Sequence, residues 1–512
     1  MPISLRQLFC FILPLTCHAV RADWLSDIGH TKLAAELDTA MPTGAGIILV
    51  QSEANNIASP PNYLPQAGGP AFFTGTGSFS GKTFHPESGA GSELGHAAAV
   101  GSFFYGNGIG VARGAAEIHL FTAVDFITRL MDGVAPQVFP GRVQNHSWAG
   151  SLGNPEQDLK AIRTFDFMID RDQRVAVAGL SGGLLAPLLG STYHAITAGT
   201  RSAVHSQSGT TTDGNGRMKP DLVVNVEYTS YASAIIAGSA ACLLENAVAS
   251  GNALAERPQV LKAVLIAGAS KQNLPQWQRD DAVEPYDDVL GAGELNLHRA
   301  WHLLNAGQQP HSSSIVCSNQ GWDFATTTTR SGGRRYFFVV PERSLAETFS
   351  ATLVWHRQIT NLLGSYSSSL PDLNLKLYAA SGLAIDALIS SSTSTVDNVE
   401  HLFLRHLPAG QYCLEVTSNT NGHDFAVAWQ VVDGIGPQLA SRISGSQLWV
   451  DASMLDPLTI YTLETASDLS SAWTAVETFR TADGTASFAH TWSSPSAPGS
   501  RQFFRLRWTP VR

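Results

Sequence analysis

The sequence lacks basic runs, and beyond its N-terminus it lacks long apolar runs. Its 32 Lys and Arg residues face 42 Asp and Glu residues, for a net charge of −10, which argues against nucleic acid as a partner. After residue 22 no segment reaches the ~18 apolar residues that a membrane span needs, so we expect no transmembrane segment. We also find no internal repeat, no glycine-rich phosphate loop and no Cys/His metal-ligand spacing, and we therefore expect no cofactor.

Cysteine is scarce as well, with five in 512 residues. Cys10 and Cys17 lie in the N-terminal segment discussed next, and Cys242 is expected to be a buried thiol. Cys317 and Cys413 fall in a β-rich region and could form a disulfide in an oxidising compartment.

Residues 1–22 have the pattern of a secretory signal peptide. Arg6 precedes the apolar stretch Leu8–Leu15, and small residues offer cleavage after Ala19 or Ala22. The sequence therefore predicts a secreted or cell-envelope protein.

The most informative stretch is residues 219–238. A Lys-Pro-Asp turn leads into an apolar strand, then Thr229-Ser230, then small and apolar residues up to Gly238. This layout predicts Ser230 at the N-terminus of a buried helix, where free N–H groups and the helix dipole favour a developing oxyanion. A core helix whose serines bond to the preceding turn is the structural alternative.

A serine nucleophile needs a base, and His96 is the candidate. It lies within Gly95–Gly101, a run of small residues that predicts a second closely packed helix start. The helix dipole there opposes protonation of the imidazole, which suits a general base. With 16 histidines in the chain, a structural role for His96 is the alternative.

Two further stretches follow His96: Gly110–Ala115, a turn leading into the strand-like residues 117–120, and Arg142–Gly150, a strand ending in small residues. Together, in this order, the blocks resemble those of the subtilisin-like serine peptidases. That family carries His-Gly-Thr-His, Gly-Val-Ala-Pro-Gly-Ala, Asn-x-Ser-x-Gly, Lys-Pro-Asp and Gly-Thr-Ser-x-Ala. The resemblance spans about residues 40–306.

This resemblance implies an α/β fold, with a parallel sheet flanked by helices, and a serine endopeptidase acting on polypeptides. It implies that Ser230 is the nucleophile and His96 the base. Ser147, Trp148 and Ala149 would line the cleft and pair with substrate backbone as an added strand.

The third triad residue departs from the family, whose first strand ends in Asp-Thr-Gly. Residues 43–50 predict a buried strand. Counting the family spacing from Gly46 leads to Glu53, which can orient a histidine as an aspartate does. Counting from Gly44 leads to Gln51, an amide that could orient the ring without offsetting its charge. We favour Glu53, and a solvated loop carboxylate is the structural alternative.

The oxyanion region also departs from the family, which has an asparagine after the strand that matches residues 174–179 here. Leu180 occupies that position and cannot donate a hydrogen bond. Losing one such donor costs about 10²–10³ in rate. The adjacent Ser181 hydroxyl and the Ser230 backbone N–H could donate instead. A catalytically inactive binding or structural protein is therefore the alternative function.

We expect four parts in the chain: signal peptide 1–22, catalytic domain 23–310, β-sandwich 311–435 and a small C-terminal β module 436–512. The sandwich is predicted from alternating runs at 335–340, 351–355, 373–378 and 425–429, and the module from runs at 448–450, 461–463 and 503–506. These modules could contact a cell surface or a glycan. The sandwich resembles one that follows the catalytic domain in some secreted subtilases, and by that resemblance Asp372 and Asp397 could hold a structural calcium ion.

Overall fold

The structure is a computed structural model. It describes residues 23–54, 59–66, 79–181, 187–207, 211–214, 216–329, 333–341, 345–434, 438–444, 447–453, 455, 460–468, 470–481, 485–491 and 503–508. The predicted signal peptide, residues 1–22, lies outside the described residues.

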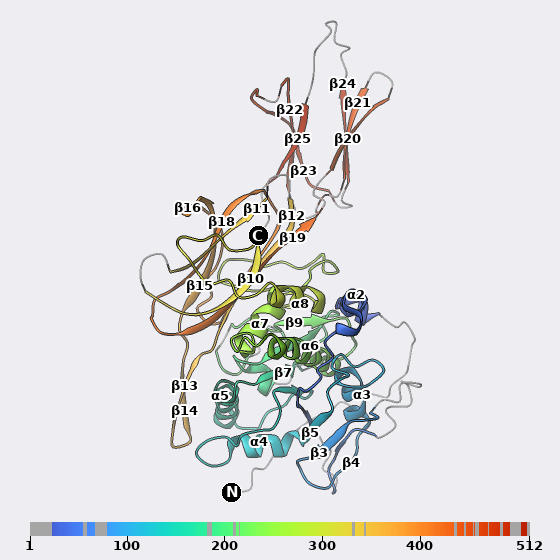
Figure 1. Ribbon diagram of the computed structural model, residues 1–512, viewed down its shortest axis with the longest axis vertical. Helices are drawn as coiled ribbons and strands as arrows, with labels where there is room; N and C mark the ends of the chain where they lie inside the picture. Colours follow the sequence, from blue (N-terminus) through green and yellow to red (C-terminus); the bar gives the residue numbers. More distant parts are fainter. Residues whose placement is uncertain are drawn as a thin grey trace.

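The first half of the chain forms a seven-stranded sheet with the strand order β3-β5-β1-β6-β7-β8-β9, in which every neighbouring pair is parallel (Figure 1). Its strands are β3 (Thr83–Pro86), β5 (Glu117–Thr122), β1 (Leu49–Glu53), β6 (Val143–His146), β7 (Val175–Gly179), β8 (Ile196–Thr200) and β9 (Leu222–Val224). The short strands β2 (Asn62–Leu64) and β4 (Ser92–Glu93) pair beside it.

Helices cover both faces of this sheet, because successive strand residues point to opposite sides. Leu49 belongs to the core on one face and Val50 to the core on the other. The first core includes residues of α3 (Gly95–Phe104), α6 (Thr229–Ser250), α7 (Pro258–Ala267) and α8 (Leu297–Asn305). The second includes residues of α4 (Ala123–Met131) and α5 (Pro155–Asp172). The predicted α/β fold is confirmed.

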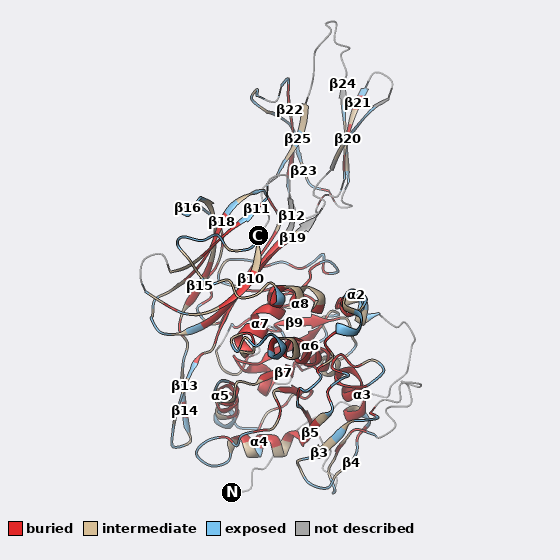
Figure 2. Ribbon diagram, in the orientation of Figure 1, coloured by how far each residue is buried: buried red, intermediate tan, exposed pale blue. Residues whose placement is uncertain are grey.

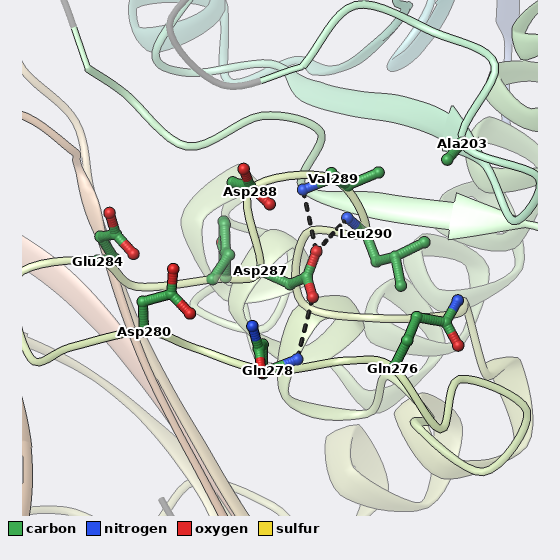
Figure 3. Close-up of a pocket in the computed structure, with 10 residues that line it drawn as sticks. Ala203, Gln276, Gln278, Asp280, Glu284, Asp287, Asp288, Val289 and Leu290 are labelled. Carbon is green, nitrogen blue, oxygen red and sulfur yellow. Dashed lines mark hydrogen bonds between the residues drawn. The ribbon is translucent and has the colours of Figure 1, made fainter.

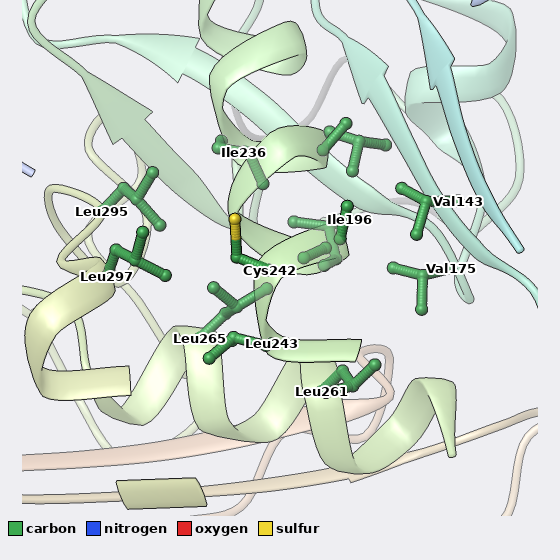
Figure 4. Packing of buried hydrophobic residues seen from close by; sticks show 14 of the residues in the cluster. Val143, Val175, Ile196, Ile236, Cys242, Leu243, Leu261, Leu265, Leu295 and Leu297 are labelled. Carbon is green, nitrogen blue, oxygen red and sulfur yellow. The ribbon is translucent and has the colours of Figure 1, made fainter. Parts of the chain in front are cut away.

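Helix α6 runs through the first core, with α7 packed beside it (Figure 4). Cys242 lies here as a buried free thiol, as predicted, and burial raises its pKa. Gly238 does not end the helix. A Cβ at this position would lie 2.8 Å from the Val111 Cβ, so the glycine permits the close approach of the segment before β5.

By length and composition, α6 is also apolar enough to cross a membrane, with a mean hydropathy of 1.5, but 78% of that window is buried inside the fold. This burial is typical of a core helix.

The first strand begins later than predicted. The expected strand over residues 43–50 is observed as β1, Leu49–Glu53, because Gly44 and Gly46 adopt left-handed φ angles of 77° and 73°. The Glu245 carboxylate accepts the N–H groups of residues 43–45 and fixes this turn.

The second half of the described chain forms a sandwich of two antiparallel four-stranded sheets, as predicted. One has the order β10-β19-β12-β17 and the other β11-β18-β15-β16. The strands are β10 (Gln320–Thr326), β11 (Arg334–Val340), β12 (Leu345–Trp355), β15 (Leu373–Ser381), β16 (Ala384–Ser392), β17 (Val399–Leu407), β18 (Gly410–Ser418) and β19 (Asp424–Gly434). A hairpin of β13 (Gln358–Leu362) and β14 (Ser365–Ser369) extends from the sandwich alongside α5 (Figure 1).

Two three-stranded sheets follow, with the orders β20-β21-β24 and β23-β22-β25. Their strands are β20 (Gln438–Ser444), β21 (Gln447–Ser453), β22 (Tyr461–Ala466), β23 (Thr474–Phe479), β24 (Ala486–Thr491) and β25 (Phe503–Trp508). The predicted C-terminal β module is confirmed as a fold.

The suggested disulfide does not form, and Cys317 and Cys413 are free thiols. Phe337 of β11 pairs with Cys413 of β18 on one side, and its carbonyl accepts the Cys317 N–H on the other side. With a whole strand between them, the two cysteines are separated by about two strand spacings, beyond the ~7 Å that a disulfide can bridge.

The sandwich packs on α7 through β12 and β19, and Figure 2 shows this contact layer buried. The Gln430 side chain donates to the Ala267 carbonyl at 2.7 Å across the contact. Asp397, one of the two predicted calcium ligands, accepts the Met218 N–H at 3.0 Å and the Ser394 hydroxyl at 2.8 Å. Calcium binding by Asp372 and Asp397 stays a prediction, and the structure gives Asp397 a second role as an interface acceptor.

Arg357 makes a buried charged contact between the sandwich and the α/β part. Its side chain is 3% exposed and donates to Asp166 at 2.8 Å and to Asp213 at 2.6 Å. Asp166 is fully buried, so its charge depends on these donors together with the N–H groups of Tyr193 and His194.

We therefore predict that Arg357→Met lowers the free energy of unfolding by about 3–5 kcal/mol, because it leaves Asp166 as an uncompensated buried charge. Urea titration followed by tryptophan fluorescence measures the change. Arg129→Met is the control, since it removes partly exposed contacts with Asp125 and Glu87, and a partly exposed ion pair contributes about 0–1 kcal/mol. Equal losses in the two variants would refute the role of Arg357.

Candidate active site

The predicted acid and base meet at the end of β1. His96 Nδ1 lies 2.6 Å from Glu53 Oε2. The Glu53 side chain is 1% exposed and the His96 side chain 24% exposed, so the imidazole separates the carboxylate from solvent. Glu53 is therefore not a solvated loop residue, and it occupies the position that orients His96.

Gln51, the other candidate for the third triad position, supports Glu53 from the same strand. Its amide nitrogen donates to Glu53 Oε1 at 2.8 Å and to the Ala97 carbonyl at 2.9 Å. Its amide oxygen accepts the Tyr105 hydroxyl at 2.7 Å. Each Glu53 oxygen thus has one donor, and the chain Tyr105–Gln51–Glu53–His96 fixes the carboxylate against α3.

Sequence reasoning missed this supporting role of Gln51 and Tyr105. The i, i+2 spacing of Gln51 and Glu53 on one strand puts both side chains on one face of the sheet, and this was the available signal. Tyr105 carries no such signal, because its contact depends on the path of α3. Gly101 makes room for it, since a Cβ there would lie 2.6 Å from the Tyr105 hydroxyl oxygen.

The hydrogen bond decides the chemistry of the His96 ring. An ionised carboxylate can only accept, so Nδ1 carries the proton and Nε2 keeps a free lone pair. Burial alone would lower the pKa of His96, but the charge of Glu53 and its hydrogen bond outweigh burial and raise that pKa above its usual value. The arrangement therefore stabilises an imidazolium.

Ser230 lies in the first turn of α6, as predicted, and is half-buried. Tyr228 is the N-cap, and its side chain makes no capping hydrogen bond. Of the two N–H groups that a capping side chain would take, that of Tyr231 donates to the Tyr228 carbonyl at 3.1 Å. The Ser230 N–H is given no partner among the described residues, so it remains available to a ligand.

Helix α3, which carries His96, packs against α6, and Phe103 stacks on Tyr231 with ring centroids 4.6 Å apart. Burial chiefly, and the charges of Tyr228, Glu227 and Glu53 in addition, raise the pKa of Tyr231 to about 12. Glu53 is therefore close enough to the start of α6 for its charge to act there.

The Ser230 hydroxyl donates a long hydrogen bond of 3.4 Å to the Ser147 carbonyl. The expected hydrogen bond between His96 and Ser230 is not among those the structure gives for the described residues. In unliganded sites, catalytic hydrogen bonds are often long or poorly aligned.

The predicted substrate strand follows β6, next to α6. The Ser147 hydroxyl donates to the Ser230 carbonyl at 2.9 Å and lies 3.0 Å from the Ser233 hydroxyl. The Trp148 indole is buried and donates to the Ser52 hydroxyl at 3.0 Å. Both side chains therefore point into the protein, Ala149 is half-buried, and the backbone alone is left to pair with a substrate. That pairing stays a prediction.

At the predicted oxyanion position, the Leu180 side chain is 3% exposed and packs toward Gly190, where a Cβ would lie 2.8 Å from Leu180 Cδ2. The Leu180 carbonyl accepts the Thr229 hydroxyl at 2.6 Å, which ties the end of β7 to the start of α6. Ser181 is buried, and its carbonyl accepts the Ser206 N–H at 2.7 Å. Residues 182–186 lie outside the described chain, and the Ser181 hydroxyl stays the predicted side-chain donor.

A separate acidic pocket lies in the segment after α7 (Figure 3). Asp287 accepts the N–H groups of residues 278, 289 and 290, so its carboxylate holds the loop together. Burial, followed by neighbouring carboxylates, raises the pKa of both Glu284 and Asp288. None of the three predicted triad residues lines this pocket.

We predict that Glu53→Gln lowers the pKa of His96, because the burial remains while the opposing charge is removed. Histidine ring NMR across a pH titration, with the His96 signal identified by its loss in His96→Asn, measures the shift. In the wild type, the raised pKa means that the pair stabilises the fold fully below pH 6.5, the ordinary value, and loses this contribution as pH rises through the raised value. An unchanged pKa in Glu53→Gln would contradict the proposed pairing.

No protein-family model matches the sequence, and no curated protein matches it. Solved structures do match. The prenylagaramide maturation protease PagA is 17% identical with a TM-score of 0.35, over 54% of this chain and 98% of that one. The patellamide maturation protease PatA is 19% identical with a TM-score of 0.34, over 51% and 98%. The epidermin leader peptide processing serine protease EpiP from Staphylococcus aureus is 12% identical with a TM-score of 0.36, over 56% and 83%. Over about half of its length, the chain is similar in fold to these three proteases.

Proposed function

We propose that this protein is a secreted subtilisin-like serine endopeptidase that hydrolyses peptide bonds through an acyl-enzyme. Ser230 is the nucleophile, His96 the general base and acid, and Glu53 the residue that orients His96. The observation that carries the proposal is the 2.6 Å hydrogen bond between His96 Nδ1 and the buried Glu53 carboxylate. A buried carboxylate that fixes the tautomer of a partly exposed histidine is what general-base catalysis requires.

The reaction begins when Ser230 rotates away from the Ser147 carbonyl and turns its hydroxyl toward His96 Nε2. The Ser230 oxygen attacks the peptide carbonyl while its proton moves to Nε2, and Glu53 stabilises the imidazolium that forms. His96 then returns the proton to the leaving amine, and the C–N bond breaks. Water, activated by the same nitrogen, hydrolyses the ester and releases Ser230.

The oxyanion is the weak point of this mechanism. The Ser230 backbone N–H, in the uncapped first turn of α6, supplies one donor. Leu180 supplies none. The adjacent Ser181 hydroxyl is the candidate replacement, and without the family's asparagine donor the enzyme is expected to turn over slowly.

Leu180 also supports a second candidate function. A catalytically inactive surface or binding protein would keep the cleft and need no donor at position 180, and the long bond from Ser230 to Ser147 fits an unused hydroxyl. In that case, the β modules would carry contact with a cell surface or glycan.

A fluorophosphonate probe separates the two functions, because it labels only an activated serine hydroxyl. We predict that the wild-type protein is labelled at Ser230 and that Ser230→Ala abolishes both labelling and peptide hydrolysis. Ser239→Ala is the matched control, since this serine lies on the same helix and donates to the Ile235 carbonyl one turn before it. Absence of labelling in folded wild-type protein would favour the inactive protein.

We further predict that Leu180→Asn raises kcat with little change in KM, because the new donor acts chiefly in the transition state. The upper limit is about 10²–10³-fold, the loss seen when intact enzymes lose that donor. Steady-state kinetics on a peptide substrate measures the gain. Ser181→Ala provides the comparison, since a loss of rate there identifies Ser181 as the present donor. Unchanged rates in both folded variants would contradict the assignment of this loop to the oxyanion.

A further inference from the structure

Three side chains with metal-binding chemistry meet on the surface between α2 (His30–Leu37) and α8. The His298 Nε2 atom lies 2.9 Å from Glu36 Oε2, and the His302 Nε2 atom lies 2.9 Å from Glu36 Oε1. One ligand atom from each of the three residues lies within 4.8 Å of the other two. The centroids of the His298 and His302 rings are 4.5 Å apart.

The spacing of the histidines explains their meeting. His298 and His302 are four residues apart on α8, so they project from one face of the helix. The same i, i+4 arrangement of two histidines on a helix holds zinc in other proteins. Glu36 comes from a helix more than 260 positions earlier in the sequence. The histidine pair is visible in the sequence and was missed, whereas the third ligand carries no sequence signal because of this distance.

The backbone holds the two helices in place. Figure 1 shows α2 beside the N-terminal end of α8, and the Leu297 N–H donates to the Ile28 carbonyl at 2.7 Å. Gly29, with a φ of 71°, permits this contact, since a Cβ there would lie 2.9 Å from both the Asn296 Oδ1 and His298 Cβ atoms. The three ligand side chains therefore extend from a fixed frame.

We propose that Glu36, His298 and His302 form a binding site for a divalent transition metal ion, with Zn²⁺ as the best fit. Two imidazole nitrogens and one carboxylate oxygen are ligands that zinc accepts, and a water molecule completes four-coordination. Ligand atoms about 2.0–2.2 Å from a tetrahedral zinc are about 3.3–3.6 Å apart. One carboxylate oxygen, Glu36 Oε2, lies 2.9 Å from His298 Nε2 and 3.1 Å from His302 Nε2, so these separations need only a small outward adjustment.

A metal ion at this site would link α2 to α8, which suggests a structural role. Helix α2 packs on the α/β core with the buried side chains of His30 and Leu33 and the half-buried side chains of Ala34 and Leu37. A metal ion shared by α2 and α8 would clasp the N-terminal segment to the body of the protein and stabilise the folded state by mass action. This role is independent of the proposed peptidase activity.

Titration of the full-length, metal-free protein with Co²⁺ tests the site, because tetrahedral Co²⁺ gives an intense visible d–d absorption. We expect saturation at one Co²⁺ per chain, displacement by Zn²⁺, and a Zn²⁺-dependent rise in the apparent Tm. His302→Ala and Glu36→Ala should each weaken binding by about 10-fold or more and remove the rise in Tm. Both side chains are more than a third exposed, so the variants are expected to fold.

His85→Ala is the matched control. His85 is 39% exposed and lies 2.6 Å from Glu117, a similar His–Glu pair on the sheet edge, and its loss should leave Co²⁺ binding unchanged. Absence of the tetrahedral Co²⁺ band in the wild-type protein would overturn the proposal. So would equal binding by wild type, His302→Ala and Glu36→Ala, which would assign the metal to other surface groups.

Discussion

The Glu53 carboxylate has no access to solvent at the end of β1, and the geometry of the site follows from how its charge is compensated. One oxygen accepts from Gln51 and the other from His96. A buried carboxylate without such partners would be strongly unfavourable. The need to satisfy Glu53 thus fixes the tautomer and orientation of His96, and it also fixes α3 against the sheet, because Gln51 bonds to the backbone of that helix.

The sandwich is part of the same folded body as the α/β part. The main core of the α/β part includes Val354, Val399, Ala426 and Ala428, which belong to the sandwich. Arg357 and Asp397 add polar contacts across the same boundary. The sandwich thereby packs on the helices that cover the sheet, chiefly on α7, from the side that faces away from the sheet. A rigid support of this kind is what an active site built from separate elements requires.

Much of this arrangement could be predicted from the sequence, because the informative residues are local. Lys-Pro-Asp, the apolar strand and Thr229-Ser230 lie within one short segment, and their order predicts a serine at a helix start. The choice between Glu53 and Gln51 could not be made by counting, since it depends on where the strand begins. The left-handed turns at Gly44 and Gly46 determine that start.

Features that depend on tertiary contacts were not predictable in the same way. The inward direction of Trp148 depends on a bond to Ser52 of β1, nearly a hundred residues earlier. The separation of Cys317 from Cys413 depends on β11 passing between them. The cluster of Glu36 with His298 and His302 brings together residues from the beginning and the end of the sequence of the α/β part. In each case, the deciding neighbour is distant in sequence.

The most direct test of the account is a crystal structure of the protein with a peptide boronate, a mimic of the tetrahedral intermediate. The account predicts a covalent bond from boron to Ser230 Oγ, with His96 Nδ1 still bonded to Glu53 and Nε2 turned toward the adduct. Crystals saturated with the boronate in which Ser230 stays unmodified and bonded to Ser147 would contradict it.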